Sequence, residues 1–124
     1  MILEEALSEV IIGACIEVHK HLGPGLLESA YERCLLYELQ SRGLKVCCQV
    51  DLPITYKGVQ IECRYRLDMV VEDKILLELK SIEKTLPIHE AQLLTYLRLS
   101  GKRVGFLINF NVKLMTDGIT RRVV

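Results

Sequence analysis

The amino-acid sequence predicts an α/β protein in which α-helices cover a mixed β-sheet. Three observations lead to this prediction. Apolar residues recur at helical spacing in the first third of the chain, β-branched and aromatic residues then mark three successive strands, and a further helix separates the third strand from a fourth. A helix between two successive strands favours a crossover that lays those strands side by side and parallel. The other strand pairs are expected to be antiparallel.

Two helices are expected before the sheet. Residues 3–22 place apolar side chains along one face of an amphipathic helix. This helix ends at the Gly-Pro-Gly turn of residues 23–25, because proline disfavours helical geometry in the residue before it. A second amphipathic helix follows over residues 26–41, and Gly43 ends it.

Three strands are expected next. Residues 45–56 and 59–71 are rich in β-branched and aromatic side chains, and the Lys57-Gly58 pair between them fits a tight turn. Residues 74–81 form the third strand. Only two or three residues separate it from the second, so an antiparallel hairpin is the shortest connection.

The C-terminal third of the chain completes the predicted sheet. Pro87 begins a helix that ends near Ser100, before Gly101. Residues 103–109 (RVGFLIN) form an apolar run that is typical of a strand buried on both faces. The Asp117-Gly118 pair then predicts the turn of a short C-terminal hairpin.

Length and composition indicate a single domain over residues 1–124. The chain is 50% hydrophobic, which supplies one continuous core and excludes a disordered protein. Sixteen Lys and Arg balance sixteen Asp and Glu, so any contact with nucleic acid must come from local patches. The candidates for a basic rim, equally well explained as a solvated surface, are Lys84, Arg98, Lys102, Arg103, Arg121 and Arg122.

Targeting features and cysteines point to a cytoplasmic protein without a membrane partner. No apolar stretch reaches the ~20 residues of a membrane span, and the N-terminus is acidic where a secretory signal is basic. The odd cysteine count and the lack of a CxxC pair argue against a disulfide framework and a common zinc site. Reduced and mostly buried thiols are expected at Cys15, Cys34, Cys47, Cys48 and Cys63.

Acidic residues interrupt two apolar strands in the segment RYRLDMVVEDKILLELKS. Asp is depleted in strands, so the presence of Asp68 needs an explanation. In one interpretation, Asp68 forms an ion pair with the neighbouring Arg64 and Arg66 on a solvent-facing side of the sheet. Glu78 and Lys80 form a similar surface pair in that interpretation. In the other, the two carboxylates meet and form a functional site.

The register of the hairpin separates these interpretations. A three-residue loop pairs Val71 with Ile75 and brings Asp68 opposite Glu78, whereas a two-residue loop puts the carboxylates on opposite faces. Two carboxylates in contact repel each other unless a cation or a proton lies between them. A hard cation held by carboxylate oxygens, with Lys80 beside it to orient or activate water, is suited to phosphodiester hydrolysis. The three-residue register is therefore a necessary condition for a catalytic site.

One motif resembles a known nuclease family. Asp68, followed after the hairpin by Glu78-Leu79-Lys80, resembles the D…(D/E)xK signature of the PD-(D/E)xK nuclease superfamily. Leu67 stands at the variable position where the name has Pro. The resemblance implies a restriction-endonuclease-like core in which Asp68, Glu78 and the carbonyl of Leu79 bind Mg²⁺ or Mn²⁺. It also implies that Lys80 acts on the attacking water.

Two further motifs occur in the order found in that superfamily. Residues 25–31 (GLLESAY) are similar to the motif of its GxxExxY family, and Gln92 with Tyr96 is similar to the QxxxY motif of an exonuclease branch. The resemblance implies that Glu28 is an additional metal ligand and that Gln92 and Tyr96 support the site or contact the nucleic-acid backbone. Without it, Glu28 is a carboxylate favoured by the helix dipole. Gln92 and Tyr96, with His89, would then be an ordinary polar helix surface.

The leading functional hypothesis is a metal-dependent hydrolase, a nuclease that cleaves phosphodiester bonds of DNA. One alternative is a catalytically silent module that keeps the nuclease fold and binds a protein or nucleic acid, which the neutral charge favours. Another is a structure-specific resolvase that acts as a homodimer, since a small domain gains substrate footprint by pairing or through an unknown protein partner. The complete set of Asp68, Glu78 and Lys80 favours the enzyme.

Overall fold

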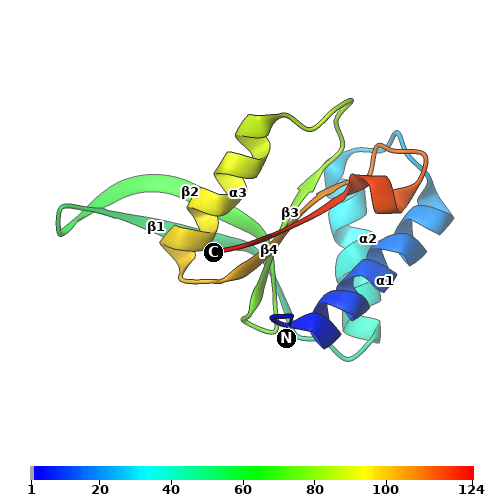
Figure 1. The fold of residues 1–124 in the computed structure, drawn as a ribbon, viewed down its shortest axis with the longest axis horizontal. Helices are drawn as coiled ribbons and strands as arrows, with labels where there is room; N and C mark the ends of the chain where they lie inside the picture. Colours follow the sequence, from blue (N-terminus) through cyan, green and yellow to red (C-terminus); the bar gives the residue numbers. More distant parts are fainter. Residues whose placement is uncertain (1) are drawn as a thin grey trace.

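A computed structural model describes residues 2–124 of the chain (Figure 1). Up to the fourth strand, the helices and strands begin and end within two residues of their predicted positions. The elements in chain order are α1 (Glu5–Leu22), α2 (Glu28–Ser41), β1 (Val46–Tyr56), β2 (Val59–Val71), β3 (Ile75–Lys80), α3 (Pro87–Ser100), β4 (Val104–Asn109), the 3₁₀ helix η1 (Met115–Gly118) and β5 (Ile119–Val123).

The five strands form one mixed sheet in the order β1-β2-β3-β4-β5. β3 and β4 are parallel, and every other neighbouring pair is antiparallel. The predicted crossover is confirmed, because α3 connects the two parallel strands. The side chains of β4 are buried on both faces of the sheet, as the apolar run predicted.

Helices cover both faces of this sheet (Figure 1). On one face, Leu35 of α2 belongs to a buried cluster with Leu77 and Phe106 of the central strands, and α1 contributes to the same cluster. On the other face, Leu93 and Leu97 of α3 form a second cluster with residues of the sheet. This α/β architecture agrees with the restriction-endonuclease-like core that the sequence resemblance implies.

β1 and β2 change faces partway along their length. Cys48 and Met69 pack on the α1 and α2 side, whereas Val50 and Leu67, two residues away on each strand, pack on the α3 side. Residues two apart on a regular strand share a face, so both strands turn over in between. Residues 50–67, the hairpin arm, extend away from the helices α1 and α2 (Figure 1).

The ends of the helices follow the predicted signals. α1 ends at Gly23, whose φ of 70° is in the left-handed region. At the start of α3, the backbone N–H of Leu86 donates to Nδ1 of His89 at 2.9 Å, so His89 is a capping residue. Gly101, with a φ of 73°, ends α3. Among residues 2–124, none of the helices combines the length and the apolar character needed to cross a membrane.

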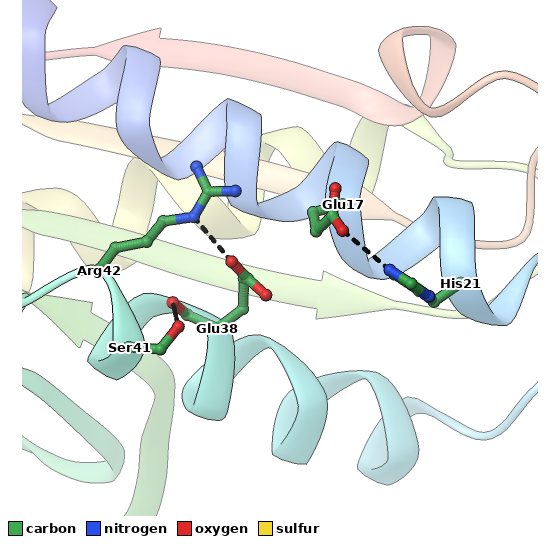
Figure 2. Close-up of polar contacts among 5 residues, drawn as sticks. All are labelled: Glu17, His21, Glu38, Ser41 and Arg42. Carbon is green, nitrogen blue, oxygen red and sulfur yellow. Dashed lines mark hydrogen bonds and ion pairs between the residues drawn. The ribbon is translucent and has the colours of Figure 1, made fainter.

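Polar contacts one turn apart support α1 and α2 (Figure 2). Nε2 of His21 lies 2.8 Å from Oε1 of Glu17, and Nε of Arg42 donates to Oε2 of Glu38 at 2.8 Å. A Cβ at Gly13 of α1 would lie 3.1 Å from Nη1 of Arg42. The absence of a side chain at Gly13 therefore lets the Arg42 guanidinium reach α1.

The C-terminal segment differs from the prediction. Asp117 and Gly118 belong to η1, and the strand after them, β5, pairs with β4 across a longer connection. A Cβ at position 118 would collide with the carbonyl oxygen of Asn109. The predicted hairpin turn is wrong. Gly118 is a glycine because two backbone segments approach closely there, and the Asp-Gly pattern alone does not distinguish this requirement from that of a turn.

The five cysteines are free, as predicted, but they are not mostly buried. Cys15 is buried, Cys34, Cys48 and Cys63 are partly exposed, and Cys47 is exposed. The burial prediction is wrong because three of them lie on β1 and β2, which leave the core at the edge of the sheet. Burial raises the pKa of the Cys15 thiol to about 12, so this group stays protonated at neutral pH.

Candidate functional site

The β2–β3 hairpin brings two carboxylates together. Val71 pairs with Ile75, so the loop has the three residues that the catalytic interpretation requires. This register places Asp68 opposite Glu78, one step beyond the last pair of the ladder. Oδ2 of Asp68 accepts a hydrogen bond from the backbone N–H of Leu79 at 2.8 Å. Beyond the end of the β2–β3 ladder, the Asp68 carboxylate thus accepts from the Leu79 N–H in place of a backbone carbonyl of β2.

Glu78 is a buried carboxyl group. Its exposed fraction is 5%, and its Oε1 has no hydrogen-bond partner among residues 2–124. Burial, followed by the proximity of Asp68, raises the pKa of Glu78 to about 9, against a smaller opposite effect of Lys80. In the absence of a bound cation, Glu78 is therefore protonated at neutral pH.

The surface ion pairs of the alternative interpretation are absent from the described part of the chain. Glu78 is inside the protein rather than on a solvent-facing side with Lys80. Arg66 pairs with Asp51 of β1, with 3.4 Å between Nε and Oδ1, instead of with Asp68. The prediction of two ordinary surface pairs is wrong, because Glu78 is buried on β3 and the Asp68 carboxylate accepts a hydrogen bond from the N–H of Leu79.

Helix α3 supplies the polar pair Gln92 and Tyr96. Nε2 of Gln92 donates to the hydroxyl of Tyr96 at 3.1 Å. Burial, followed by the charges of Glu78, Tyr65 and Asp68, raises the pKa of Tyr96 against a smaller opposite effect of Gln92. Tyr96 packs against the buried cluster that contains Leu67, next to Asp68, and Leu76, two residues before Glu78, so α3 brings the QxxxY motif to the same region of the sheet.

Tyr65 borders the same region and was not predicted as a site residue. Its ring lies 6.3 Å from the ring of Tyr96, centroid to centroid, in an edge-to-face arrangement with an interplanar angle of 62°. About half of Tyr65 is exposed. The sequence did not indicate that Tyr65 lies next to Tyr96, because aromatic residues are common on strands.

The GxxExxY segment forms a turn that Tyr31 holds. The hydroxyl of Tyr31 donates to the carbonyl of Gly23 at 2.6 Å and accepts from the backbone N–H of Leu26 at 3.1 Å. Its buried ring stacks on Phe110 with 4.5 Å between centroids. Gly25, with a φ of 98°, permits the turn between these contacts. Gly25 and Tyr31 of the motif therefore have structural roles.

The same turn places Glu28 near the end of β3. The hydroxyl of Ser81, directly after β3, donates to the carbonyl of Leu26, two residues before α2 begins. Glu28 is exposed in the first turn of α2, two residues farther on. No three His, Cys, Asp or Glu side chains among residues 2–124 gather into a metal-binding group, so Glu28 does not join Asp68 and Glu78 in this structure.

Lys80 ends β3 beside Asn109 of β4. Lys80 follows Glu78 by two residues on β3, and its positive charge partly opposes the rise in the pKa of Glu78. Oδ1 of Asn109 accepts from the backbone N–H of Ile82 at 3.1 Å, and its Nδ2 donates to the carbonyl of Ile82 at 3.0 Å. Asn109 thereby fixes the chain after Lys80. It was missed as a site residue, although a polar residue at the end of a fully buried strand requires partners.

The donor atoms fit one divalent cation. The buried, unpartnered Oε1 of Glu78 next to the Asp68 carboxylate needs a proton or a positive charge. The N–H and C=O of one strand residue point to the same side, so the Leu79 carbonyl faces the Asp68 side of β3. Mg²⁺ commonly takes one or two carboxylates and completes its shell with water, so this donor set is sufficient.

The basic residues suggested as a rim are largely engaged within the protein. Nζ of Lys102 lies 2.8 Å from Oδ1 of Asp73, and Nη2 of Arg122 lies 2.8 Å from Oε1 of Glu90. Arg121 donates to a backbone carbonyl near the N-terminus. These contacts favour the alternative of a solvated and internally paired surface.

Comparison with known proteins identifies the family. A family model of the PD-(D/E)XK nuclease superfamily matches residues 5–123, which span every helix and strand from α1 to β5. Searches among curated proteins and among solved structures find no match. Assignment to the GxxExxY family stays a prediction. The chain belongs to the PD-(D/E)XK nuclease superfamily.

Proposed function

We propose that this protein is a metal-dependent nuclease that hydrolyses phosphodiester bonds of DNA with Mg²⁺ or Mn²⁺. Membership of the superfamily supports nuclease activity in general. The observation that carries the proposal is the buried carboxyl of Glu78, whose Oε1 lacks a partner among residues 2–124 and which lies against Asp68. Such a pair needs a proton or a cation between its carboxyl groups, and the cation is the occupant that we propose for the working protein.

The residues around this pair have separate roles in the proposed reaction. When bound, the cation supplies polarisation of the phosphate and a lowered pKa for a coordinated water. Asp68, Glu78 and the Leu79 carbonyl hold it. Lys80, at the end of β3, orients or activates the attacking water. Glu28 is proposed as a further ligand, on the basis of its position near the end of β3.

Gln92 and Tyr96 support the site from α3. Because Gln92 donates to the Tyr96 hydroxyl, the proton of that hydroxyl is left for another acceptor. The nearby carboxylates and a phosphate oxygen of the substrate are the acceptors of suitable charge. We therefore assign the pair to holding the carboxylates or the nucleic-acid backbone.

Cleavage of labelled DNA and RNA with Mg²⁺, Mn²⁺ or EDTA tests the proposal. The isosteric variants Asp68→Asn and Glu78→Gln should lose cleavage, because each removes a charged ligand. Asp51→Asn changes an exposed carboxylate of the hairpin arm and serves as the matched control. If the wild-type protein cuts no substrate and calorimetry detects no Mn²⁺ binding, the nuclease proposal is wrong.

A catalytically silent nuclease-fold module is the second candidate. The absence of a three-residue acidic group within residues 2–124 and the zero net charge favour it. Mn²⁺ binding without cleavage of any substrate would support this module or a requirement for a protein partner. A homodimeric resolvase stays a prediction from the small size of the domain. The free cysteines support the reducing cytoplasm as the location.

A further inference from the structure

Gln49 has an unusual backbone conformation for a residue inside a strand. Its φ is 53°, in the left-handed region that glutamine adopts only at an energetic cost. Within residues 2–124, the other non-glycine residues with positive φ lie at the start of α1 or in hairpin turns, namely Glu4, Lys57, Glu72 and Asp73. Among these residues, strain of this kind within a strand is therefore confined to Gln49.

The conformation of Gln49 interrupts the β1–β2 ladder at Asp68. Cys48 and Val50, on either side of Gln49, both pair with their partners on β2. Gln49 and Asp68, which this register places opposite each other, do not pair. Both strands change faces at the same step. The left-handed residue therefore lies where the strand that carries Asp68 turns over.

A contact from α2 holds the side chain of Gln49. Its Nε2 donates to Oε1 of Glu32 at 2.8 Å. Cys48 packs on the α1 and α2 side, so regular alternation would direct the next side chain to the α3 side. The positive φ instead directs the Gln49 side chain to α2, where Glu32 accepts its hydrogen bond.

We propose that Gln49, held by Glu32, is a positioning residue for Asp68. The turned backbone releases Asp68 from pairing with β1 and lets its carboxylate reach the N–H of Leu79, at 2.8 Å, beside Glu78. A regular residue at position 49 would continue the β1–β2 ladder through Asp68, without the step at which both strands change faces and the Asp68 carboxylate reaches the N–H of Leu79. The consequence for metal binding rests on the nuclease proposed above, whereas the placement of Asp68 against Leu79 does not.

A comparison of Gln49→Gly with Gln49→Val tests this role. Both variants lose the contact with Glu32, but glycine adopts positive φ freely and β-branched valine opposes it. Hydrogen exchange of the Leu79 amide reports the bond to Asp68 directly, and the β4 amides of the same sample report global unfolding. Leu79 should exchange about tenfold faster in the valine variant and within about twofold of wild type in the glycine variant.

Gln60→Val is the matched control, because Gln60 is an exposed glutamine with regular pairing on the hairpin arm. It should leave the exchange of Leu79 unchanged. If Gln49→Val does not fold, Gln49→Ala against Gln49→Asn provides the same comparison, since asparagine tolerates the left-handed region and alanine does not. Calorimetry should show Mn²⁺ affinity about tenfold weaker in the valine or alanine variant only.

Two results would overturn the role of Gln49. One is an unchanged Leu79 exchange rate in the valine or alanine variant. The other is equal acceleration in both members of a pair, since the conformation of residue 49 would then be irrelevant. Failure of the nuclease proposal gives a different result, in which the wild-type protein neither binds Mn²⁺ nor cleaves nucleic acid. Hydrogen exchange of the Leu79 amide would still decide the role of Gln49 in that case.

Discussion

Glu78 determines how the metal-free protein responds to pH. Its pKa in the folded state is about 9, whereas an unfolded chain has an ordinary value near 4.5. Below pH 4.5 both states are protonated, so the group costs no stability there. As pH rises from 4.5 toward 9, the unfolded state loses this proton first, and the folded state becomes progressively less stable relative to it.

Replacing Glu78 by glutamine should remove this dependence. In EDTA at pH 8, Glu78→Gln should be more stable than wild type by at least about 1.4 kcal/mol, the equivalent of one pKa unit. At pH 4 the two proteins should differ much less. Urea denaturation at both pH values measures the effect. Equal stability of the two proteins at pH 8 would show that Glu78 is ionised or solvated in the folded state.

Lys80 should affect the reaction without affecting the metal. Lys80 lies two residues after Glu78 on β3, and its ammonium group has no lone pair with which to bind a metal ion. Lys80→Ala should lower the cleavage rate by about 100-fold or more while calorimetry shows Mn²⁺ binding close to wild type. Lys84→Ala, at an exposed position after β3, is the control. Loss of Mn²⁺ binding in Lys80→Ala would contradict the assigned role.

Individual site residues could be predicted where the pattern was local. The sequence left a two-residue and a three-residue loop open, and it predicted that Asp68 meets Glu78 only in the three-residue register, which the structure adopts. The burial of Glu78 could not be predicted, because it depends on the packing of α3 against the sheet. Gln49 was missed for a related reason, since its side-chain partner, Glu32, lies 17 positions away in sequence on α2.

At the level of elements, the turn before α2 links the N-terminal helices to the sheet. Tyr31 closes the turn by two hydrogen bonds, and Ser81 joins the turn to the end of β3. Glu28 owes its position near β3 to these contacts. The turn was predicted from its Gly-Pro-Gly composition, but its attachment to β3 was not, because Leu26 and Ser81 lie 55 positions apart.

Tyr31→Phe tests this link. The variant keeps the stacking on Phe110 but leaves the Gly23 carbonyl and the Leu26 N–H without the Tyr31 partner. It should lower the free energy of unfolding by about 1–3 kcal/mol. Urea denaturation measures the change. Tyr37→Phe alters an exposed tyrosine of the same helix and should change stability by less than about 0.5 kcal/mol.

Helix and strand boundaries were predictable where the signals that end them are local. Pro87 and Gly101 mark the ends of α3, and Gly43 follows the end of α2. The Asp117-Gly118 pair was misleading as a turn signal. Glycine is required at position 118 because a Cβ there would collide with the backbone carbonyl of Asn109, which is distant in sequence. Periodicity likewise did not reveal that β1 and β2 change faces, since it assumes a regular alternation.

On the scale of the whole molecule, the proposed site draws on the sheet and on α3. Asp68 and Glu78 come from the sheet and Gln92 and Tyr96 from α3, whereas Glu28, in the opposite helical layer, does not gather with the two carboxylates. The mixed sheet and its parallel crossover were predictable from element order, because few topologies satisfy it. The convergence of motifs from several elements was predictable only from the family resemblance.

A divalent cation that binds the proposed site should raise the free energy of unfolding of the whole protein. A ligand that binds only the folded state at about 100 times its dissociation constant adds about 2.7 kcal/mol. Mg²⁺ or Mn²⁺ should raise Tm at pH 7.5, and the increase should be absent in Asp68→Asn. Ca²⁺-free and EDTA-treated samples provide the baseline. An equal increase in the variant would place the responsible cation elsewhere.

In the proposed metal site, the proton held by Glu78 would make cation binding an exchange reaction. Near neutral pH, a cation that takes both carboxylates must displace about one proton into the buffer. The apparent affinity should therefore rise with pH, by about tenfold per unit below pH 9. The heat of binding should vary with the ionisation enthalpy of the buffer. A fall in local pH would thus unload the cation while the fold remains intact.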